Sequence, residues 1–237
     1  MKKDHRPYIV KHLSAQFQNW YVNYFLRPQF EHLGKEFIFV GSRHIEITGW
    51  PITLGDYANV VATPDRKVRL TVWSNREDRG RIRLGDYCLI CPGVRISSAS
   101  EIVIGDNCMM AQGVYITDSD WHDIYDRSVI IGEKSAPIRI GNNVWLGDSV
   151  IVCKGVTIGD NSVIGAGAVV VKEIPPNVVA AGNPAVVVKH LDPERELKTR
   201  SEWFTKLAVL DEMDRKVRKK NTIFGWLRSK VFPVRGD

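Results

Sequence analysis

The sequence predicts an all-β solenoid, in which short parallel strands stack into a coil. A six-residue repeat runs without a break from Ile140 to Pro175, and a short fixed period indicates a repeat architecture. The same register recurs upstream, in two repeats from Leu54, three from Leu84 and three from Ile104. All fourteen repeats open with Leu, Ile, Val or Met, so the first position of each repeat is suited to a buried core.

Each repeat supplies one short strand and one corner, and three repeats close one turn of the coil. The fifth position is Ala, Ser, Cys or Val in eleven of the fourteen repeats, which avoids crowding inside a narrow coil. Gly, Asn and Asp recur at the corners, where they tolerate unusual backbone angles. Successive turns stack about 4.8 Å apart, and each turn is stable only between neighbours.

The segment IGNNVWLGDSVIVCKGVTIGDNSVIGAGAVVVKEIPPNVVAAGNPA, which begins at Ile140, resembles the hexapeptide-repeat acyltransferases. The similarity is greatest to the branch that contains galactoside, maltose and nodulation-factor O-acetyltransferases, and it covers about residues 50–190. The resemblance implies a left-handed parallel β-helix, a homotrimer and an acyl-coenzyme A donor bound in the cleft between subunits. The left hand follows from the resemblance, because the spacing of the repeats does not fix chirality.

The repeat divides the chain into three regions. Residues 1–48 are expected to form an N-terminal helical cap, and residues 191–237 a C-terminal helical, basic extension. Residues 49–190 are expected to form the β-helix acyltransferase domain, with excursions at 65–83 and 122–137 where the register fails. An excursion from a rigid coil is where function is expected to lie.

Both terminal regions show helical spacing. Near the N-terminus aromatic residues recur every three or four positions, up to Pro28, which should end or kink the helix; they are Phe17, Trp20, Tyr21, Tyr24 and Phe25. The helix either covers the exposed end of the coil or contacts a lipid or acceptor. The C-terminal region either packs on the exterior of the trimer or anchors at a membrane surface, through Phe224, Trp226, Leu227 and Phe232 beside eight Lys or Arg between Arg215 and Arg235.

Composition narrows the class of protein. The formal net charge is +6, no apolar run approaches the ~18 residues that span a bilayer, and no secretory signal follows the basic start. The expected location is therefore cytoplasmic, with peripheral contact at the inner face of the membrane as the alternative. Cys88 and Cys108 fall at inward positions one turn apart, and Cys88 and Cys91 form a single C-x-x-C without a second ligand pair. Neither a metal site nor a nucleic-acid motif is expected.

His122 is the predicted general base. Acyl transfer from a thioester to a hydroxyl requires proton removal from the attacking hydroxyl and alignment of both substrates, and histidine titrates near neutral pH. Of the six histidines, only His122 lies inside the repeat region, where the register breaks into the second excursion. In the O-acetyltransferases that the chain resembles, the general base is a histidine at the corresponding break. The resemblance therefore implies that His122 takes the acceptor proton and then returns a proton to the thiolate.

Neighbouring polar residues are candidates to orient His122 or to bind the acceptor. Asp120 occupies a fifth position where other repeats have a small residue, and a buried unpaired carboxylate is costly, so either the coil opens there or the carboxylate has a partner. Asp118 and Asp123 share the candidate role, and some of the three could simply cap turns. Tyr125 and Arg127 in the excursion are further candidates to contact the acceptor.

The resemblance also implies a donor site. Trp145 matches a tryptophan near the pantetheine cleft, and Gly147-Asp148 lies where the family often has Gly-Ser, so the hydroxyl contact is in doubt. Ala166 and Gly167 match small residues beside the pantetheine arm. Val171 and Lys172 match a pair in which Lys172 keeps the cation for the phosphates, and Lys189 matches a basic residue near the adenosine. Ordinary repeat geometry is the alternative reading of each.

These observations predict an acyl-CoA-dependent O-acyltransferase that transfers acetyl from acetyl-CoA to a hydroxyl of a saccharide or glycan precursor. The alternatives are an acetyltransferase that acts on an antibiotic or a lipid-linked acceptor, and a non-catalytic β-helix scaffold. β-Helical carbonic anhydrases need three zinc-binding histidines on adjacent turns, and the repeat region supplies one. The sequence fixes neither the acceptor nor the acyl chain.

Overall fold

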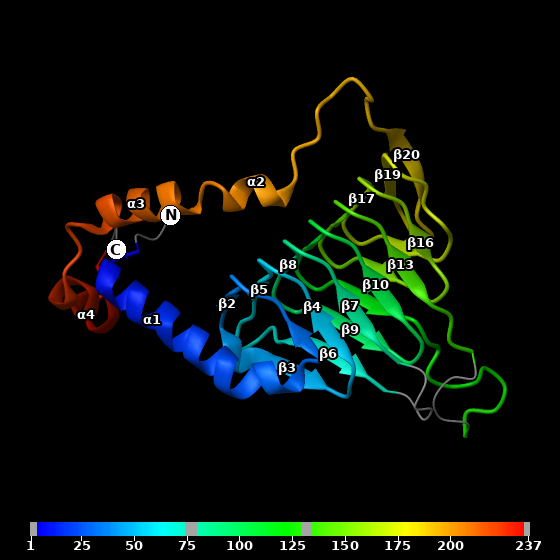
Figure 1. The fold of residues 1–237 in the computed structure, drawn as a ribbon, viewed down its shortest axis with the longest axis horizontal. Coiled ribbons are helices and arrows are strands. Elements are labelled where there is room, and N and C mark those ends of the chain that lie inside the picture. Colours follow the sequence, from blue (N-terminus) through cyan, green and yellow to red (C-terminus); the bar gives the residue numbers. More distant parts are fainter. Residues whose placement is uncertain (1–3, 74–79, 129–133, 235–237) are drawn as a thin grey trace.

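Short strands make up the middle of the chain and helices make up both ends (Figure 1). The computed structural model describes residues 4–73, 80–128 and 134–234. The N-terminal helical segments are α1 (Tyr8–Tyr21), a π-helical turn (Val22–Leu26) and two 3-10 turns (Arg27–Gln29 and Ser42–His44). The C-terminal helices are α2 (Arg200–Phe204), α3 (Leu207–Arg218) and α4 (Ile223–Val231).

The described strands form three sheets. Sheet A contains, in spatial order, β1 (His32–Leu33), β4 (Ile52–Leu54), β7 (Ile82–Leu84), β10 (Ile102–Ile104), β13 (Ile138–Ile140) and β16 (Thr157–Ile158). Sheet B contains β2 (Ile38–Val40), β5 (Asn59–Val61), β8 (Leu89–Ile90), β11 (Met109–Met110), β14 (Trp145–Leu146), β17 (Val163–Ile164), β19 (Val178–Ala181) and β20 (Val186–His190). Sheet C contains β3 (Ile45–Thr48), β6 (Val68–Val72), β9 (Arg95–Ser98), β12 (Tyr115–Thr117), β15 (Ile151–Val152) and β18 (Val169–Val170).

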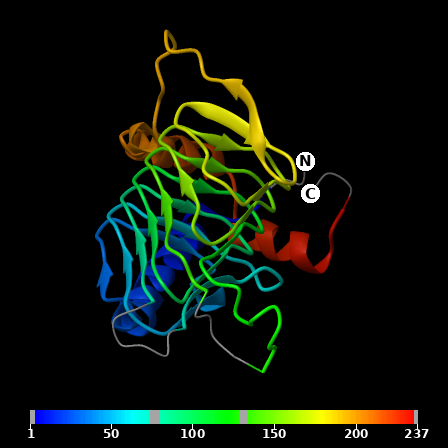
Figure 2. The ribbon, with the colours of Figure 1, turned by 90° about the vertical axis from the view of Figure 1, so that its right-hand side faces the viewer.

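Up to β19, consecutive strands lie in different sheets, and up to β18 the chain returns to the same sheet after every third strand. Neighbouring strands are parallel and in register, as at Ile102, which pairs with Ile82 on one side and Ile138 on the other. Among the described strands only β20 is antiparallel to its neighbour, β19; Figure 2 shows this pair in yellow. The first residues of the repeats point inward from all three sheets into one hydrophobic core. The predicted parallel strands and helical extensions are confirmed.

The Gly-Asp corners form a ladder of hydrogen bonds along the coil. The Oδ1 atom of Asp106 accepts a hydrogen bond of 2.8 Å from the backbone N–H of Asp86, and Asp86 accepts one of 2.7 Å from Asp56 in the same way. A Cβ on Gly85 would lie 2.1 Å from Asp106 Oδ1, so the glycine is required for close approach between turns. The positive φ falls two residues after the glycine, at Tyr87 (58°) and, at later corners, at Asn107 (60°) and Asn143 (55°). An asparagine therefore carries the unusual angle at those later corners, as the recurrence of Gly, Asn and Asp predicts.

The coil begins earlier than predicted. Strands β1, β2 and β3 lie within the expected cap, residues 1–48, and pair in parallel with β4, β5 and β6. Their connections lack the Gly-Asp corners that mark the later repeats, so the hexad pattern did not reveal them.

The first predicted excursion, residues 65–83, contains strand β6, which pairs in register with β9. The hexad period would place the next inward residue closer to Val60 in the sequence. The corner at residues 63–67 is longer than in the other repeats, so Leu70 fills that inward position instead. The second excursion lies between β12 and β13, as predicted. Residues 74–79 and 129–133 of the two excursions lie outside the described residues.

The N-terminal helix covers the first turn of the coil through its last residues. Helix α1 buries none of its own side chains, whereas Val22 and Leu26 of the π-helical turn and Phe30 after it belong to the core of the coil. Pro28 lies in the 3-10 turn that ends the helical segment, as predicted. The aromatic residues on the helix pack on one another, as Tyr21 and Phe25 do with ring centroids 4.8 Å apart.

The C-terminal segment leaves the coil after β20 and returns beside it to α1 (Figure 1). Helix α2 docks on the corners of sheets A and B, where the rings of Tyr57 and Tyr87 stack 4.8 Å apart and Phe204 packs edge-on against both. The Nε atom of Arg200 donates a hydrogen bond of 3.0 Å to the carbonyl oxygen of Tyr87. The predicted helical C-terminal extension therefore has a defined attachment to the coil.

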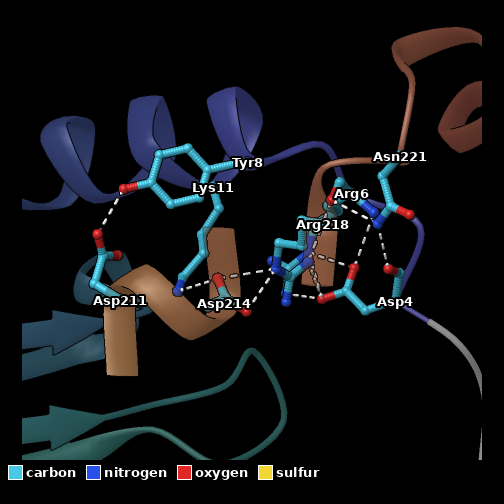
Figure 3. A network of polar contacts seen from close by, with 8 residues as sticks. All are labelled: Asp4, Arg6, Tyr8, Lys11, Asp211, Asp214, Arg218 and Asn221. Carbon is cyan, nitrogen blue, oxygen red and sulfur yellow. Dashed lines mark hydrogen bonds and ion pairs between the residues drawn. The ribbon is translucent and has the colours of Figure 1, made fainter. Parts of the chain in front are cut away.

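Helix α3 then binds α1 through a polar network (Figure 3). Tyr8 donates a hydrogen bond of 2.8 Å to Asp211, and the Nζ atom of Lys11 lies 2.6 Å from a carboxylate oxygen of Asp214. Arg218 forms ion pairs with both Asp214 and Asp4. These contacts bring the two helical extensions together beside the coil.

No described helix is both long and apolar enough to cross a membrane. In α4 the side chains of Phe224 and Leu227 are exposed. Membrane contact by this segment stays a prediction.

Candidate active site

The outer face of sheet C carries a ladder of polar and aromatic side chains. Along β6, β9 and β12 every second residue points inward and is buried, so the residues between them point outward. Parallel pairing aligns Arg69 with Arg95 and Tyr115, and aligns Thr71 with Ser97. The guanidinium carbon of Arg95 lies 4.3 Å from the centre of the Tyr115 ring, a cation–π geometry.

The chain turns sharply after β12 and presents His122. Trp121 adopts a φ of 63°, and its indole N–H donates a hydrogen bond of 2.9 Å to the hydroxyl of Thr117. Its ring meets Trp73 edge-on, with centroids 6.2 Å apart. The backbone N–H of His122 donates a hydrogen bond of 2.8 Å to the carbonyl oxygen of Asp120. The backbone at His122 is thus fixed by the last strand before the excursion.

These residues enclose a cavity of about 300 Å³ on the face of sheet C. Its lining consists of Arg69, Thr71, Trp73, Arg95, Ser97, Tyr115, Trp121 and His122. His122 is exposed, and its imidazole has no hydrogen-bond partner within the described part of the chain. A cavity with aromatic walls and a few convergent polar groups is the usual form of a small-molecule site.

The carboxylate of Asp118 is directed into the coil and not toward His122. Asp118 is fully buried, and its oxygens accept hydrogen bonds from the Ser98 hydroxyl (2.7 Å) and from the backbone N–H groups of Ala99 (2.7 Å) and Ser100 (2.9 Å). Burial raises the pKa of this carboxyl above its ordinary value, and the hydrogen bonds oppose the shift without cancelling it. Asp118 holds one turn of the coil to the preceding one.

Asp120 and Asp123 have cationic partners of their own. Asp120 forms an ion pair with Lys154, which also donates a hydrogen bond of 2.9 Å to the carbonyl oxygen of Lys134. Asp123 lies 2.8 Å from the Nζ atom of Lys134, and this contact, with two backbone hydrogen bonds, holds the pKa of Asp123 well below its usual range. The structure therefore places none of the three carboxylates on the His122 ring. For Asp120 both alternatives hold, because the coil opens there and the carboxylate has a partner.

Tyr125 and Arg127 are exposed and do not line the cavity. Tyr125 is 90% exposed, and its backbone N–H is capped by Asp123 Oδ1 at 2.8 Å. Neither side chain is brought toward His122 in this structure.

The predicted donor residues lie farther along the coil. Trp145 is on the outer face of β14, between Met109 and Val163 of the neighbouring strands, and is 47% exposed. The corner at Gly147-Asp148 stacks on the next one, where the N–H of Gly167 donates a hydrogen bond of 2.7 Å to the carbonyl oxygen of Asp148. Ala166 and Gly167 are exposed at that corner.

The last three predicted donor residues are separate from that corner. Val171 and Lys172 are exposed after β18, and Lys189 lies on β20. None of the predicted donor residues lines the cavity beside His122. Within one chain the predicted donor residues therefore lie apart from the cavity beside His122.

Sequence reasoning missed most of the cavity lining. Arg69 and Thr71 lie on β6, inside a segment that was expected to be an excursion, and Arg95, Ser97 and Tyr115 were not among the predicted site residues. A usable signal exists, because polar and aromatic residues recur at outward positions of successive turns just before His122. Among the described residues, no group of three or more His, Cys, Asp or Glu is placed to hold a metal ion.

Comparison with known proteins identifies the repeat. Residues 137–172 match the family model "Bacterial transferase hexapeptide (six repeats)". These residues are bacterial transferase hexapeptide repeats. The hexapeptide segment starts directly after the second excursion and carries β13 to β18, so the resemblance to hexapeptide-repeat acyltransferases is confirmed there.

Two similar proteins extend the comparison. Galactoside O-acetyltransferase of Escherichia coli (strain K12) is 50% identical over 112 residues, which cover 47% of this chain and 45% of that protein. The chain thus matches less than half the length of this hexapeptide relative. The crystal structure of AntD, an N-acyltransferase from Bacillus cereus, has a TM-score of 0.52 at 15% identity and covers 81% of this chain and 96% of its own. That likeness supports the fold alone.

Proposed function

We propose that this chain is an acetyl-CoA-dependent O-acetyltransferase that acts on a hydroxyl of a saccharide, with His122 as general base. One observation carries the proposal: the exposed His122 imidazole borders a cavity with aromatic and hydroxyl walls, at the interruption before the hexapeptide segment. The similarity to galactoside O-acetyltransferase supports acetyl transfer to a sugar hydroxyl.

In this reaction His122 would act twice. A neutral imidazole accepts the proton of the acceptor hydroxyl as its oxygen attacks the thioester carbonyl carbon, so that a C–O bond forms and a tetrahedral oxyanion results. The C–S bond then breaks, and the imidazolium returns the proton to the departing thiolate. Trp73 and Trp121 would exclude water from the acceptor and align its hydroxyl with His122, which supplies the proximity component of catalysis.

Acetyl-CoA is proposed to bind along the hexapeptide segment. A Cβ on Gly167 would meet no atom within 4 Å, so an open strip runs beside that corner, which fits the passage of a narrow pantetheine arm. Trp145, Gly147, Asp148 and Ala166 would flank the arm. Val171 would offer its backbone, and Lys172 and Lys189 would face the phosphates and adenosine end.

We further propose a left-handed coil that assembles as a homotrimer. The donor residues of one chain do not reach the cavity beside its own His122, and a site between two copies would join the groups that a single chain keeps apart. Each chain of this assembly would contain the three predicted regions, which are the N-terminal cap, the repeat domain and the basic extension, except that the coil starts at β1.

The test follows thiol release from acetyl-CoA with a panel of sugars, lipids and antibiotics. We expect turnover with at least one saccharide and a loss of about 100-fold or more in kcat for His122→Ala. His190→Ala is the matched control, because His190 is also exposed but lies on β20. If His122→Ala and wild type turn over alike, His122 is not the base. If calorimetry detects no coenzyme A binding, the chain is a scaffold and the proposal fails.

A further inference from the structure

The cavity beside His122 contains cations that the transfer reaction does not use. Arg69 and Arg95 occupy outward positions of sheet C, Lys67 directly precedes β6, and one carboxylate, Glu46, pairs with Lys67 and Arg69. Glu46 is shared, at 2.5 Å from Lys67 Nζ and 2.6 Å from Arg69 Nε. Lys67 and Arg69 hold the pKa of Glu46 below its ordinary value. Three cations against one acid leave this part of the face positively charged.

Arg95 has no acidic partner among the described residues. It lies over the ring of Tyr115, which restrains a long side chain without neutralising it, and it lines the cavity that His122 borders. A guanidinium restrained in this way is suited to paired hydrogen bonds with a carboxylate or a phosphate.

A second hollow, of about 540 Å³, meets the first at Arg69 and Arg95. Both arginines line both hollows. Arg66 and Lys67 also line the second hollow, and Asp65 is the acid in its lining. A ligand that occupies the cavity beside His122 could therefore extend over a basic surface larger than one sugar ring requires.

Aromatic residues on the opposite side of the cavity complete the pattern. Trp73 and Trp121 meet edge-on, and their faces are suited to the apolar face of a sugar ring, while Thr71 and Ser97 supply hydroxyls between the aromatic residues and the arginines. The lining is thus aromatic at the end beside His122 and cationic at the other.

We propose that the acceptor is an acidic saccharide, whose ring packs on Trp73 and Trp121 and whose carboxylate or phosphate binds Arg95, with Arg69 beside it. This inference rests on the proposed function and specifies its substrate class. The shared chemistry is an anionic group on a sugar that also presents a free hydroxyl to His122.

The experiment compares kcat/KM for acetyl transfer to galactose, galacturonate and galactose 6-phosphate, and to short oligomers of galacturonate. We expect the anionic acceptors to be preferred over galactose, with a preference that weakens as ionic strength rises. Arg95→Gln should reduce kcat/KM for the anionic acceptors by about tenfold or more beyond any change that it causes with galactose, because a charge-assisted hydrogen-bond pair is lost. The carboxylate and phosphate acceptors show which anion the site prefers.

Arg83→Gln is the matched control, because Arg83 is an exposed outward arginine on β7 of sheet A, away from the cavity. Equal use of neutral and anionic acceptors by wild type, with no effect of Arg95→Gln, would overturn the inference while the acetyltransferase stands. An increase in KM for acetyl-CoA in place of the acceptor would also overturn it, because the arginine would then serve the donor phosphates. If the wild-type protein turns over no acceptor and binds no coenzyme A, the proposed function itself is rejected.

Discussion

The hydroxyl of Ser98 donates a hydrogen bond of 2.7 Å to the carboxylate of Asp118, and both side chains are fully buried. The pair joins the end of β9 to the residue that follows β12, one turn later in the coil. Asp118 therefore fixes the point from which the chain departs toward His122.

Replacing Asp118 should destabilise the coil. Asp118→Asn leaves one acceptor oxygen for three donors and turns an NH₂ group toward another donor, so the free energy of unfolding should fall by about 1–3 kcal/mol. Chemical denaturation measures the change. Asp126→Asn, at an exposed carboxylate in the excursion, should have little effect; an equal loss in both variants would argue against the buried network.

The same pair predicts a pH dependence. Burial raises the pKa of Asp118 in the folded protein above its ordinary value of 3.8. The folded state therefore binds this proton more tightly than the unfolded state, and the contribution to stability is complete below pH 3.8 and lost as pH rises through the folded pKa. The difference in unfolding free energy between wild type and Asp118→Asn should shrink over that range. A constant difference, measured by denaturation at several pH values, would contradict this assignment.

Phe204 should hold helix α2 on the coil. Its ring is largely buried and packs edge-on against Tyr57 and Tyr87. Phe204→Ala removes both aromatic pairs between α2 and the coil. Amide hydrogen exchange in α2 should therefore become faster by about tenfold or more, while exchange in β8 and β11 stays slow. Trp203→Ala, at a more exposed ring on the same helix, should have a smaller effect on exchange.

The network between α1 and α3 should release at low pH. Hydrogen bonds from Arg6 hold the pKa of Asp4 well below its usual range. At Asp214 burial raises the pKa, but hydrogen bonds from Lys11 and Arg218 outweigh it and lower the net value. These groups stabilise the contact above about pH 3.8, and the stabilisation is lost as pH falls through the lowered values.

Small-angle scattering at pH 6 and at about pH 1 tests the release, with circular dichroism as the check that the coil persists. The maximum dimension should increase at the lower pH. Arg218→Met should show part of that increase already at pH 6, because it removes both ion pairs of Arg218. An unchanged dimension at about pH 1 with an intact coil would count against the network as the attachment.

Gly167 provides a test of the proposed donor strip. A leucine there would occupy open space and would cost about 1–2 kcal/mol, because φ is +70°. Gly167→Leu should weaken coenzyme A binding by about tenfold, measured by calorimetry. Gly155→Leu is the control, since Gly155 has a φ of +73° at another corner. Equal affinity in the two variants would place the donor elsewhere.

The periodic part of the fold was predictable from sequence. Ile140, Leu146 and the other repeat openers had to point inward, because a fixed six-residue period places the large aliphatic residue at the same inward position in every repeat. Strand β6 was not predictable in this way, since the longer corner at residues 63–67 shifts Leu70 out of the period while its pairing with Ile96 is kept. The six-residue period depends on the length of each corner as well as on the strands. A strand that pairs regularly is therefore missed when the corner before it has an unusual length.

The site was predictable only in part. His122 stood out because it is the single histidine inside the repeat region and lies at a break in the register. The role of Asp118 could not be read, because its position near His122 in sequence does not reveal that its side chain turns inward to Ser98. The juxtaposition of Arg69, Arg95 and Trp73 with His122 depends on stacking between turns, which places residues about one turn apart beside one another.

The attachment of α3 to α1 also sets an order of assembly. Tyr8 and Asp211 are 203 positions apart, whereas the corner hydrogen bonds between turns, such as those of Asp86, Asp106 and Asn142, join residues that are 18 to 36 positions apart. Closing the longer loop costs more chain entropy, and its gain depends on a coil that already presents Tyr57 and Tyr87 to Phe204. We expect the turns of the coil to stack first during folding and the C-terminal extension to dock last. The extension is then the part that detaches most readily, and its release would leave the stacked turns intact.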